Sequence, residues 1–308
     1  MAKVFIDGSA GTTGLRIRER LATRTGMQLI VLDEASRKDP AARREALDAA
    51  DVAFLCLPDA AAEEAVALCS NPDTAIIDTS TAHRTAAGWT YGFPELEGAR
   101  ERIAASKRIA NPGCHASGFI ALVEPLVAAG LLDPAARLCA FSLTGYSGGG
   151  KKMIADYEAA RDLPHSGGRQ YALGQSHKHL PEMAKVCGLA NPPVFSPVVV
   201  PHYSGMEVTV QLSACAVKGG LEAARECLRA RYSAQGGVIS FAEDLSEGGF
   251  VSSAALSGRD SMLVAAYGND DRLVLVSLFD NLGKGASGAA IQNMNIVLGR
   301  PETEGLVL

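Results

Sequence analysis

The sequence predicts an α/β protein that combines a Rossmann dinucleotide-binding domain with an α+β domain containing a mixed sheet. Short apolar segments alternate with helical patterns in the N-terminal part, which is typical of a parallel sheet with crossover helices. A glycine-rich turn lies directly between the first strand and the first helix. After about residue 112 the pattern changes to longer strands mixed with helices. The length of 308 residues fits two domains of about 150 residues each.

Each element follows from its apolar pattern. In the N-terminal part we expect strands at 3–7, 27–32, 51–57 and 75–78, and helices at 15–21 and 60–69. These strands are unbroken apolar runs, which indicates burial on both faces. Further strands are expected at 138–143, 194–200, 207–212, 262–267 and 273–279, and helices at 113–129, 151–161, 221–232 and 285–298. Because no low-complexity linker separates the domains, we expect the active site in the crevice between them.

Composition and charge exclude several classes of protein. The chain is 47% hydrophobic and 20% charged, as folded domains are, and no run approaches the ~18 apolar residues of a membrane span. The N-terminus lacks the segments of a signal peptide. A net charge of −5 without a basic run indicates no nucleic-acid surface. Seven cysteines without CxxC or zinc-finger spacing fit a reducing compartment, so we expect a cytoplasmic protein that binds small molecules.

The glycine-rich turn predicts a dinucleotide site. It has the pattern G-x-x-G-x-x-G, and the expected cofactor contacts are Gly8, Ser9, Gly11, Thr12, Thr13 and Gly14. Glycines let the backbone approach a pyrophosphate closely, and the N-terminus of the next helix stabilises its charge. A glycine pattern alone is weak evidence, but its position between a strand and a helix strengthens it.

The end of the second strand bears on the choice between NAD and NADP. Asp33 and Glu34 would suit the ribose hydroxyls of NAD. Ser36, Arg37 and Lys38 follow at once and offer a hydroxyl and two cations to the additional phosphate of NADP. On this charge pattern we favour NADP(H).

One cysteine stands in a context that a structural cysteine does not need. Asn111, Pro112 and Gly113 form a sharp turn before Cys114, which falls in the first turn of the expected helix. Unpaired N–H groups and the helix dipole stabilise a thiolate at such a position. We therefore predict that Cys114 is a nucleophile and that the other six cysteines are structural.

A thiol nucleophile needs a base, because little of it is ionised at neutral pH. His177 and His179 flank Lys178, and in an extended loop both imidazoles would face the same way. Either can accept the thiol proton and later protonate the departing oxygen, and we favour His179 slightly. His115 is not expected to be the base, since neighbours on a helix diverge. No third ligand at suitable spacing supports a metal site.

Five stretches spread along the chain carry a resemblance. They read GSAGTTG at 8–14, DTSTAHR at 78–84, NPGC at 111–114, HKHLPE at 177–182 and DNLGKGASGAAIQNMN at 280–295. On these motifs the chain resembles N-acetyl-γ-glutamyl-phosphate reductases of the shorter type, in the wider aspartate-semialdehyde dehydrogenase superfamily.

The resemblance implies an enzyme of arginine biosynthesis that reduces an acyl phosphate to a semialdehyde with NADPH and releases phosphate. It implies a Rossmann domain at 1–112, completed by the last helix at 284–308, and a catalytic and dimerisation domain at 113–283. A homodimer or homotetramer, the nucleophile Cys114 and a base in the 177–182 stretch are also implied. The additional cofactor contacts are Asn281, Lys284 and Gly285.

Substrate contacts are expected on three segments. Arg84 follows the strand that ends at Asp78, at the edge where open α/β sheets bind ligands. The family motifs add Asn111, Ser147 and Gly148, the last two in a glycine-rich loop that would hold an anion. A third segment departs from the family pattern, because Ser204 stands where longer members have an arginine. We expect His202 to supply the missing cation.

The implied reaction is covalent. Attack by Cys114 on the acyl carbon expels phosphate and gives a thioester, which hydride from NADPH reduces, while backbone N–H groups at the helix start hold the oxyanion. Three alternatives stay open. The same chemistry on aspartyl or aminoadipyl phosphate would be distinguished by substrate assays. A non-catalytic dinucleotide sensor would not need the Asn-Pro-Gly-Cys turn, and a cysteine hydrolase would not need the glycine loop.

Overall fold

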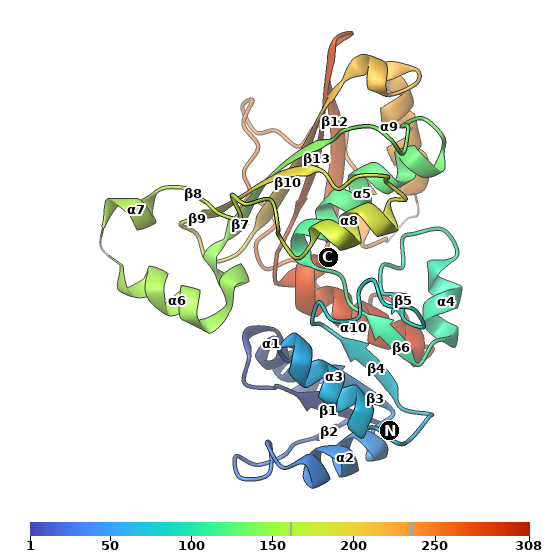
Figure 1. Cartoon of the computed structure of the whole chain (residues 1–308), viewed down its shortest axis with the longest axis vertical. Helices are drawn as coiled ribbons and strands as arrows, with labels where there is room; N and C mark the ends of the chain where they lie inside the picture. Colours follow the sequence, from blue (N-terminus) through green and yellow to red (C-terminus); the bar gives the residue numbers. More distant parts are fainter. Residues whose placement is uncertain (161, 234–236) are drawn as a thin grey trace. The chain divides into compact units, whose positions relative to one another are not determined.

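A computed structural model describes residues 1–160, 162–233 and 237–308. These residues form two compact units, coloured along the chain in Figure 1. Unit 1 comprises Met1–Gly113 and Ala286–Leu306, and unit 2 comprises Cys114–Gly285 and Val307–Leu308. Among the described helices, none is long and apolar enough to cross a membrane. The predicted fold class, a parallel α/β unit combined with a mixed-sheet unit, is confirmed.

Unit 1 is built on a parallel sheet with the strand order β2-β1-β3-β4-β6-β5. The strands are β1 (Ala2–Asp7), β2 (Met27–Ile30), β3 (Val52–Leu55), β4 (Ala75–Asp78), β5 (Thr90–Tyr91) and β6 (Arg108–Ala110). The register aligns Asp7 with Leu55 and Leu55 with Asp78. The carboxyl ends of β1, β3 and β4 therefore lie at one edge of the sheet, where open α/β sheets bind ligands.

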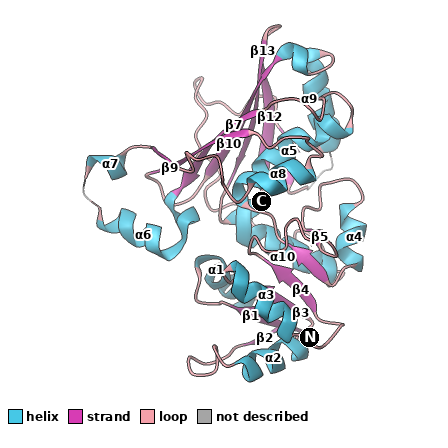
Figure 2. Cartoon of the chain, viewed as in Figure 1, coloured by secondary structure: helices cyan, strands magenta, loops and turns pink. Residues whose placement is uncertain are grey.

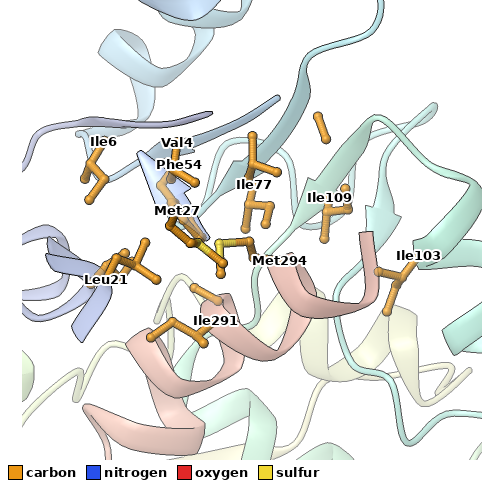
Figure 3. Close-up of a cluster of buried hydrophobic side chains, with 14 of the residues drawn as sticks. Val4, Ile6, Leu21, Met27, Phe54, Ile77, Ile103, Ile109, Ile291 and Met294 are labelled. Atoms are coloured by element: carbon orange, nitrogen blue, oxygen red, sulfur yellow. The ribbon is translucent and has the colours of Figure 1, made fainter. Parts of the chain in front are cut away.

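Helices cover both faces of this sheet. They are α1 (Thr12–Ala22), α2 (Pro40–Ala49), α3 (Asp59–Leu68), α4 (Ala99–Ala105) and α10 (Gly288–Val297). On one face Val4 and Ile77 pack against Met294 of α10, as Figure 3 shows. On the other face Phe5 packs with Leu47 of α2. Because helices cover both faces of the sheet, the strands are apolar on both sides.

Unit 2 is built on a mixed sheet with the order β11-β12-β13-β10-β7-β9-β8. The strands are β7 (Cys139–Gly145), β8 (Arg169–Gln170), β9 (Val194–Val200), β10 (Met206–Ser213), β11 (Ile239–Phe241), β12 (Met262–Gly268) and β13 (Arg272–Phe279). The pairs β7–β9 and β11–β12 are parallel and the other pairs are antiparallel.

The helices of unit 2 are α5 (Cys114–Ala128), α6 (Gly150–Ala159), α7 (Leu163–Ser166), α8 (Leu180–Val186) and α9 (Gly220–Arg231). Figure 2 shows α5, α8 and α9 along one face of the sheet, and α5 packs on β10 and β13. Val208 and Val210 of β10 are fully buried beneath this layer. Residues that alternate with them, such as Thr209, point to the other face.

Several element bounds differ from expectation. The strand β2 ends at Ile30, two residues early, and the last helix begins with a π-helical turn, Gly283–Ser287, before α10. The helix α6 ends at Ala159, and Arg161, the predicted end, lies outside the described residues. The sequence patterns missed the short elements α4, α7, α8, β5, β6, β8 and β11, and also the longer helix α2.

Candidate active site

The glycine loop after β1 has the tight packing that a dinucleotide site needs. Gly8 has a φ of 87°, and a Cβ there would lie 2.2 Å from the carbonyl oxygen of Cys56. A Cβ on Gly14 would lie 2.5 Å from the carbonyl oxygen of Gly8. Gly11 precedes α1, and no side chain caps this helix. The N–H groups of its first turn are therefore available to an anion.

A pocket of about 300 Å³ adjoins this loop. Of the predicted cofactor contacts, its lining includes Gly8, Ser9, Gly11, Arg37 and Lys38. A third cation, Arg18 of α1, also lines the pocket and was missed in the sequence. Its spacing could have predicted this position, because Gly11, Gly14 and Arg18 fall on one face of the helix.

The polar groups of this pocket and of the loops that carry it fit NADP(H). The hydroxyl oxygen of Thr12 is buried and has no hydrogen-bond partner among the described residues. Asp33 accepts a hydrogen bond of 2.8 Å from the backbone N–H of Ser36, and its hydrogen bonds with Ser36 hold its pKa below the usual range. Its carboxylate is thus already engaged within the loop. Arg37 forms an ion pair with Glu34 and, with Arg18 and Lys38, gives a cationic lining suited to a phosphate.

Cys114 is the first residue of α5 and is half-buried. Gly285 packs so tightly that a Cβ on it would lie 2.9 Å from the Cβ of Cys114. This contact explains the glycine at position 285, which the sequence assigned to cofactor binding. Burial raises the pKa of the Cys56 thiol to about 12 and also raises those of Cys69, Cys187 and Cys227. These four thiols are therefore poor nucleophiles.

Three histidines of unit 2 gather in one cluster. The ring centroids of His177 and His179 are 4.7 Å apart, and that of His115 lies 5.3 Å and 5.5 Å from them. The segment 177–179 is not extended as expected, because the backbone N–H of Leu180 bonds to the carbonyl of His177 in a turn. A turn therefore brings the two imidazoles together, and not the alternation of side chains along an extended segment that the sequence suggested.

The environment of His179 suits a base. It is 6% exposed, and its Nε2 lies 4.0 Å from a carboxylate oxygen of Glu182, which is 1% exposed. A buried carboxylate beside an imidazole stabilises the protonated form. His177 has a different contact, because its Nδ1 accepts a hydrogen bond of 3.1 Å from the backbone N–H of His179.

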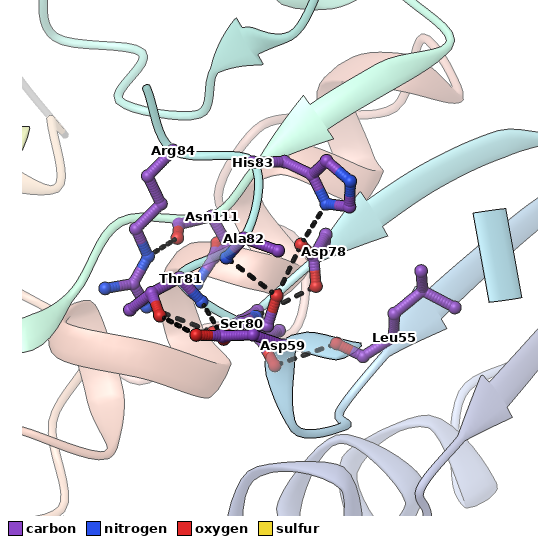
Figure 4. A network of polar contacts seen from close by, with 10 residues as sticks. Leu55, Asp59, Asp78, Ser80, Thr81, Ala82, His83, Arg84 and Asn111 are labelled. Atoms are coloured by element: carbon purple, nitrogen blue, oxygen red, sulfur yellow. Dashed lines mark hydrogen bonds and ion pairs between the residues drawn. The ribbon is translucent and has the colours of Figure 1, made fainter. Parts of the chain in front are cut away.

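In unit 1, a polar network holds the turn that carries Arg84 (Figure 4). Asp78 is fully buried, accepts a hydrogen bond of 2.7 Å from the Ser80 hydroxyl and lies 2.6 Å from Nδ1 of His83. Arg84 donates through Nε to the carbonyl of Asn111 and through Nη2 to that of Thr79, both at 3.0 Å. Arg84 thus braces the backbone three residues before Cys114.

Two of the predicted contacts are asparagines that make structural hydrogen bonds. In unit 1, the Asn111 amide donates to the carbonyl of Ala286 and accepts from Asn293, both at 3.1 Å. In unit 2, the Asn281 amide donates to the Ser147 hydroxyl and accepts from the backbone N–H of Gly205, both at 3.0 Å. Asn281 therefore joins the loop of Ser147 to that of Gly205.

Three of the remaining predicted contacts in unit 2 are Ser147, Gly148 and Lys284. Ser147 is 1% exposed, and Lys284 is 1% exposed as well. A Cβ on Gly148 would lie 3.3 Å from the hydroxyl of Thr144, so this position too is closely packed. Ser147 and Lys284 therefore belong to the packed interior of unit 2, whereas Gly148 is exposed.

In the segment that departs from the family pattern, Ser204 is held by two other side chains of unit 2. Ser204 is 5% exposed, lies 2.6 Å from the Ser257 hydroxyl and donates to Asp280 at 3.1 Å. Burial lowers the pKa of His202 and so disfavours its charged form. The contact of a cationic His202 with the substrate stays a prediction, and the lowered pKa of His202 speaks against it. Its Nε2 is buried without a hydrogen-bond partner in the described part of the chain, so it suits a neutral contact.

Comparison with known proteins places this site in a family. Residues 3–106 match the model described as "Semialdehyde dehydrogenase, NAD binding domain", and residues 114–281 match "Semialdehyde dehydrogenase, dimerisation domain". The fold is that of aspartate semialdehyde dehydrogenase II from Vibrio cholerae, complexed with ASA, with a TM-score of 0.71, 16% identity and coverage of 97% and 98% of the two chains. The enzyme from Candida albicans with NADP gives a TM-score of 0.69 at 15% identity, over 97% and 99%.

Sequence relatives are closer. The chain is 45% identical over 307 residues to the N-acetyl-gamma-glutamyl-phosphate reductase of Brucella anthropi, covering 97% of this chain and 99% of that protein. It is 43% identical over 310 residues to N-acetyl-gamma-glutamyl-phosphate reductase 2 of Pseudomonas putida, covering 98% of both. The chain therefore belongs to the N-acetyl-gamma-glutamyl-phosphate reductase family of the semialdehyde dehydrogenases.

Proposed function

We propose that the chain reduces N-acetyl-L-glutamyl 5-phosphate to N-acetyl-L-glutamate 5-semialdehyde and releases phosphate, as a step of arginine biosynthesis. The observation that carries this proposal is identity of more than 40% with such reductases over nearly the full chain. NADPH supplies the hydride, and the residues that would hold it are the glycine loop with Arg18, Arg37 and Lys38.

Within the chain, Cys114 is the nucleophile and His179 the base. The Cys114 thiolate forms a bond to the acyl carbon as the bond to phosphate breaks, which gives a thioester on the sulfur. His179, next to Glu182, takes the thiol proton and returns a proton when the product leaves. The N–H groups of the first turn of α5 stabilise the oxyanion. Arg84 holds the backbone that precedes the nucleophile and presents a cation to the substrate phosphate.

The activity is tested by the reverse reaction. We expect phosphate-dependent reduction of NADP with N-acetylglutamate semialdehyde, and much less with aspartate semialdehyde. A preference for aspartate semialdehyde would contradict this proposal and indicate aspartyl phosphate as the substrate. NADPH binding without turnover of either substrate would favour the non-catalytic sensor.

Replacement of Arg37 tests the cofactor site. Arg37→Ala should weaken NADP binding by roughly 10- to 150-fold, the worth of a lost charge-assisted hydrogen bond, and leave NAD binding nearly unchanged. Titration calorimetry with both cofactors measures this. Arg44→Ala, an exposed arginine of α2 outside the pocket, is the matched control. Equal losses for NAD and NADP, or a native preference for NAD, would contradict the assignment.

We further propose a homo-oligomer formed through the face of the unit 2 sheet opposite α5. Phe141 lies on that face, in register with Thr209, and is only half-buried in the single chain. Light scattering should give at least twice the chain mass of 32.1 kDa at micromolar concentration. Phe141→Glu should lower the mass, whereas Leu163→Glu, at a side chain 85% exposed on α7, should not. A wild-type monomer would contradict this proposal.

A further inference from the structure

Asp7 is an acid in the wall of a pocket whose expected ligand carries phosphate groups. It is the last residue of β1 and directly precedes the glycine loop. Among the described residues that line the pocket of about 300 Å³, Asp7 is the only one with a carboxylate side chain. The pyrophosphate of the cofactor is expected at this loop, because the uncapped N-terminus of α1 follows it. A carboxylate without an opposing charge would repel the cofactor there.

Arg43 of α2 supplies this opposing charge from behind the wall. Its Nε donates a hydrogen bond of 3.0 Å to a carboxylate oxygen of Asp7, and its Nη2 lies 2.9 Å from the same oxygen. Asp7 is 5% exposed and Arg43 is 7% exposed, so solvent ions screen the pair little. Arg43 is not one of the described residues that line the pocket. It therefore acts on the pocket through Asp7.

The backbone that carries Asp7 is tightly held. The backbone N–H of Cys56 donates to the carbonyl of Asp7 at 2.8 Å, and a Cβ on the next residue, Gly8, would lie 2.2 Å from the carbonyl oxygen of Cys56. Phe5, two residues before Asp7, packs with Leu47 of α2, so alternation along β1 also directs the Asp7 side chain toward α2. The carboxylate is therefore fixed between the pocket and Arg43.

The surroundings of Asp7 act on its ionisation in opposite directions. Burial raises the pKa of Asp7, and the guanidinium of Arg43 opposes this rise. Arg43 thus favours the ionised carboxylate and cancels its charge in the same contact. The other charged or titratable groups near this carboxylate are Glu64 of α3, the Cys56 thiol after β3, and Arg18, Arg37 and Lys38 in the lining of the pocket.

We propose that Arg43 is a positioning residue of the cofactor site, which neutralises Asp7 so that the pyrophosphate of NADP(H) can lie at the glycine loop. The buried ion pair has two consequences. The wall of the pocket presents no net negative charge to the cofactor, and Asp7 stays fixed to α2. The inference rests on the cofactor site of the proposed function. Its test measures binding without turnover, so failure of the proposed reaction would be seen separately, in the activity assay.

Replacement of Arg43 by an uncharged residue of similar length is the first test. In Arg43→Met the carboxylate of Asp7 loses its opposing charge, so we expect the dissociation constants of NADP and NAD to rise by the same factor, on the order of 10-fold. Both cofactors share the pyrophosphate, whereas Arg37→Ala should affect NADP alone. Titration calorimetry measures both constants. Arg44→Met, at the exposed neighbour on α2, is the matched control and should change neither.

The pH dependence of binding separates charge repulsion from a loss of structure. Without Arg43, protonation of Asp7 removes the repelling charge, so the NADP affinity of Arg43→Met should approach that of the wild type as the pH falls from about 8 to about 5.5. The ratio of the two dissociation constants is compared at each pH, which cancels the titration of the cofactor itself. A ratio that stays constant with pH would contradict the inference.

Three further variants complete the test, and thermal denaturation without cofactor checks that each is folded. Asp7→Asn combined with Arg43→Met removes both charges and should bind NADP within about threefold of the wild type. Arg43→Lys keeps the charge and should retain most of the affinity. Asp7→Asn alone should not weaken binding, which decides the point even if Arg43→Met does not fold.

Two results would overturn the inference. If Asp7→Asn weakened the binding of NADP, Asp7 would be a direct contact of the cofactor. If the folded double variant bound as weakly as Arg43→Met, Arg43 would act on the structure of the loop and not on the charge of Asp7.

Discussion

Cys114→Ala should abolish reduction of the acyl phosphate while NADPH affinity stays almost intact. The cofactor pocket is lined by residues of unit 1 and does not include Cys114. Cys114→Ser should also be nearly inactive, since a serine hydroxyl stays protonated at a site where a cysteine ionises. Steady-state kinetics and cofactor titration together measure this. Turnover by Cys114→Ala would overturn the covalent mechanism.

The thiol itself can be compared with two internal controls. Cys139 and Cys215 are exposed, so their reaction with iodoacetamide is not limited by burial. Cys114 is less accessible than both, since it is half-buried. We nevertheless expect it to react faster, because the first turn of α5 stabilises its thiolate. NADP with substrate should protect Cys114 and leave Cys139 and Cys215 unprotected. Slower labelling of Cys114 than of these exposed thiols would contradict an activated nucleophile.

The second large effect is expected at His179. His179→Asn should lower kcat by about 10²–10⁴-fold, the usual contribution of a general acid–base group. A base acts in its deprotonated form, so wild-type activity should rise with pH through the ionisation of this imidazole. That limb of the profile should flatten in the variant.

Two variants control for the loss of an imidazole. His165→Asn removes a histidine that pairs with Asp162 on α7, outside the cluster, and should change kcat little. His177→Asn removes the imidazole but can keep an acceptor for the His179 N–H, and it should cost less than His179→Asn. If His177→Asn caused the larger loss of kcat and the flatter pH profile, the base would be His177 and not His179.

Local patterns were sufficient to predict most of unit 1 and the place of Cys114 in the first turn of α5. Strand β4 and the turn at Asn111–Cys114 are defined by contiguous residues, and β4 has the predicted bounds. The helix α2 was missed because its apolar face is small, although Asp39 caps it and Pro40 starts it, which are recognised helix signals.

Contacts between distant residues could not be predicted in this way. His115 meets Ser142 at a separation of 27 residues and Tyr171 at 56, through the pairing of strands in unit 2. Helical geometry turns His115 from its neighbour Cys114 but does not say what lies on the side to which it points. The lowered pKa of His202 likewise depends on burial that the tertiary fold creates.

The most direct test of the covalent account is a rapid-mixing experiment in the reverse direction without phosphate. Mixing enzyme with NADP and N-acetylglutamate semialdehyde should produce a burst of NADPH of about one equivalent per Cys114, after which turnover stalls because the acyl group remains on the sulfur. Mass spectrometry should find the acyl group on the Cys114 peptide, and added phosphate should restart turnover. Continuous NADPH formation without phosphate, or a burst that persists in Cys114→Ala, would contradict a thioester at this residue.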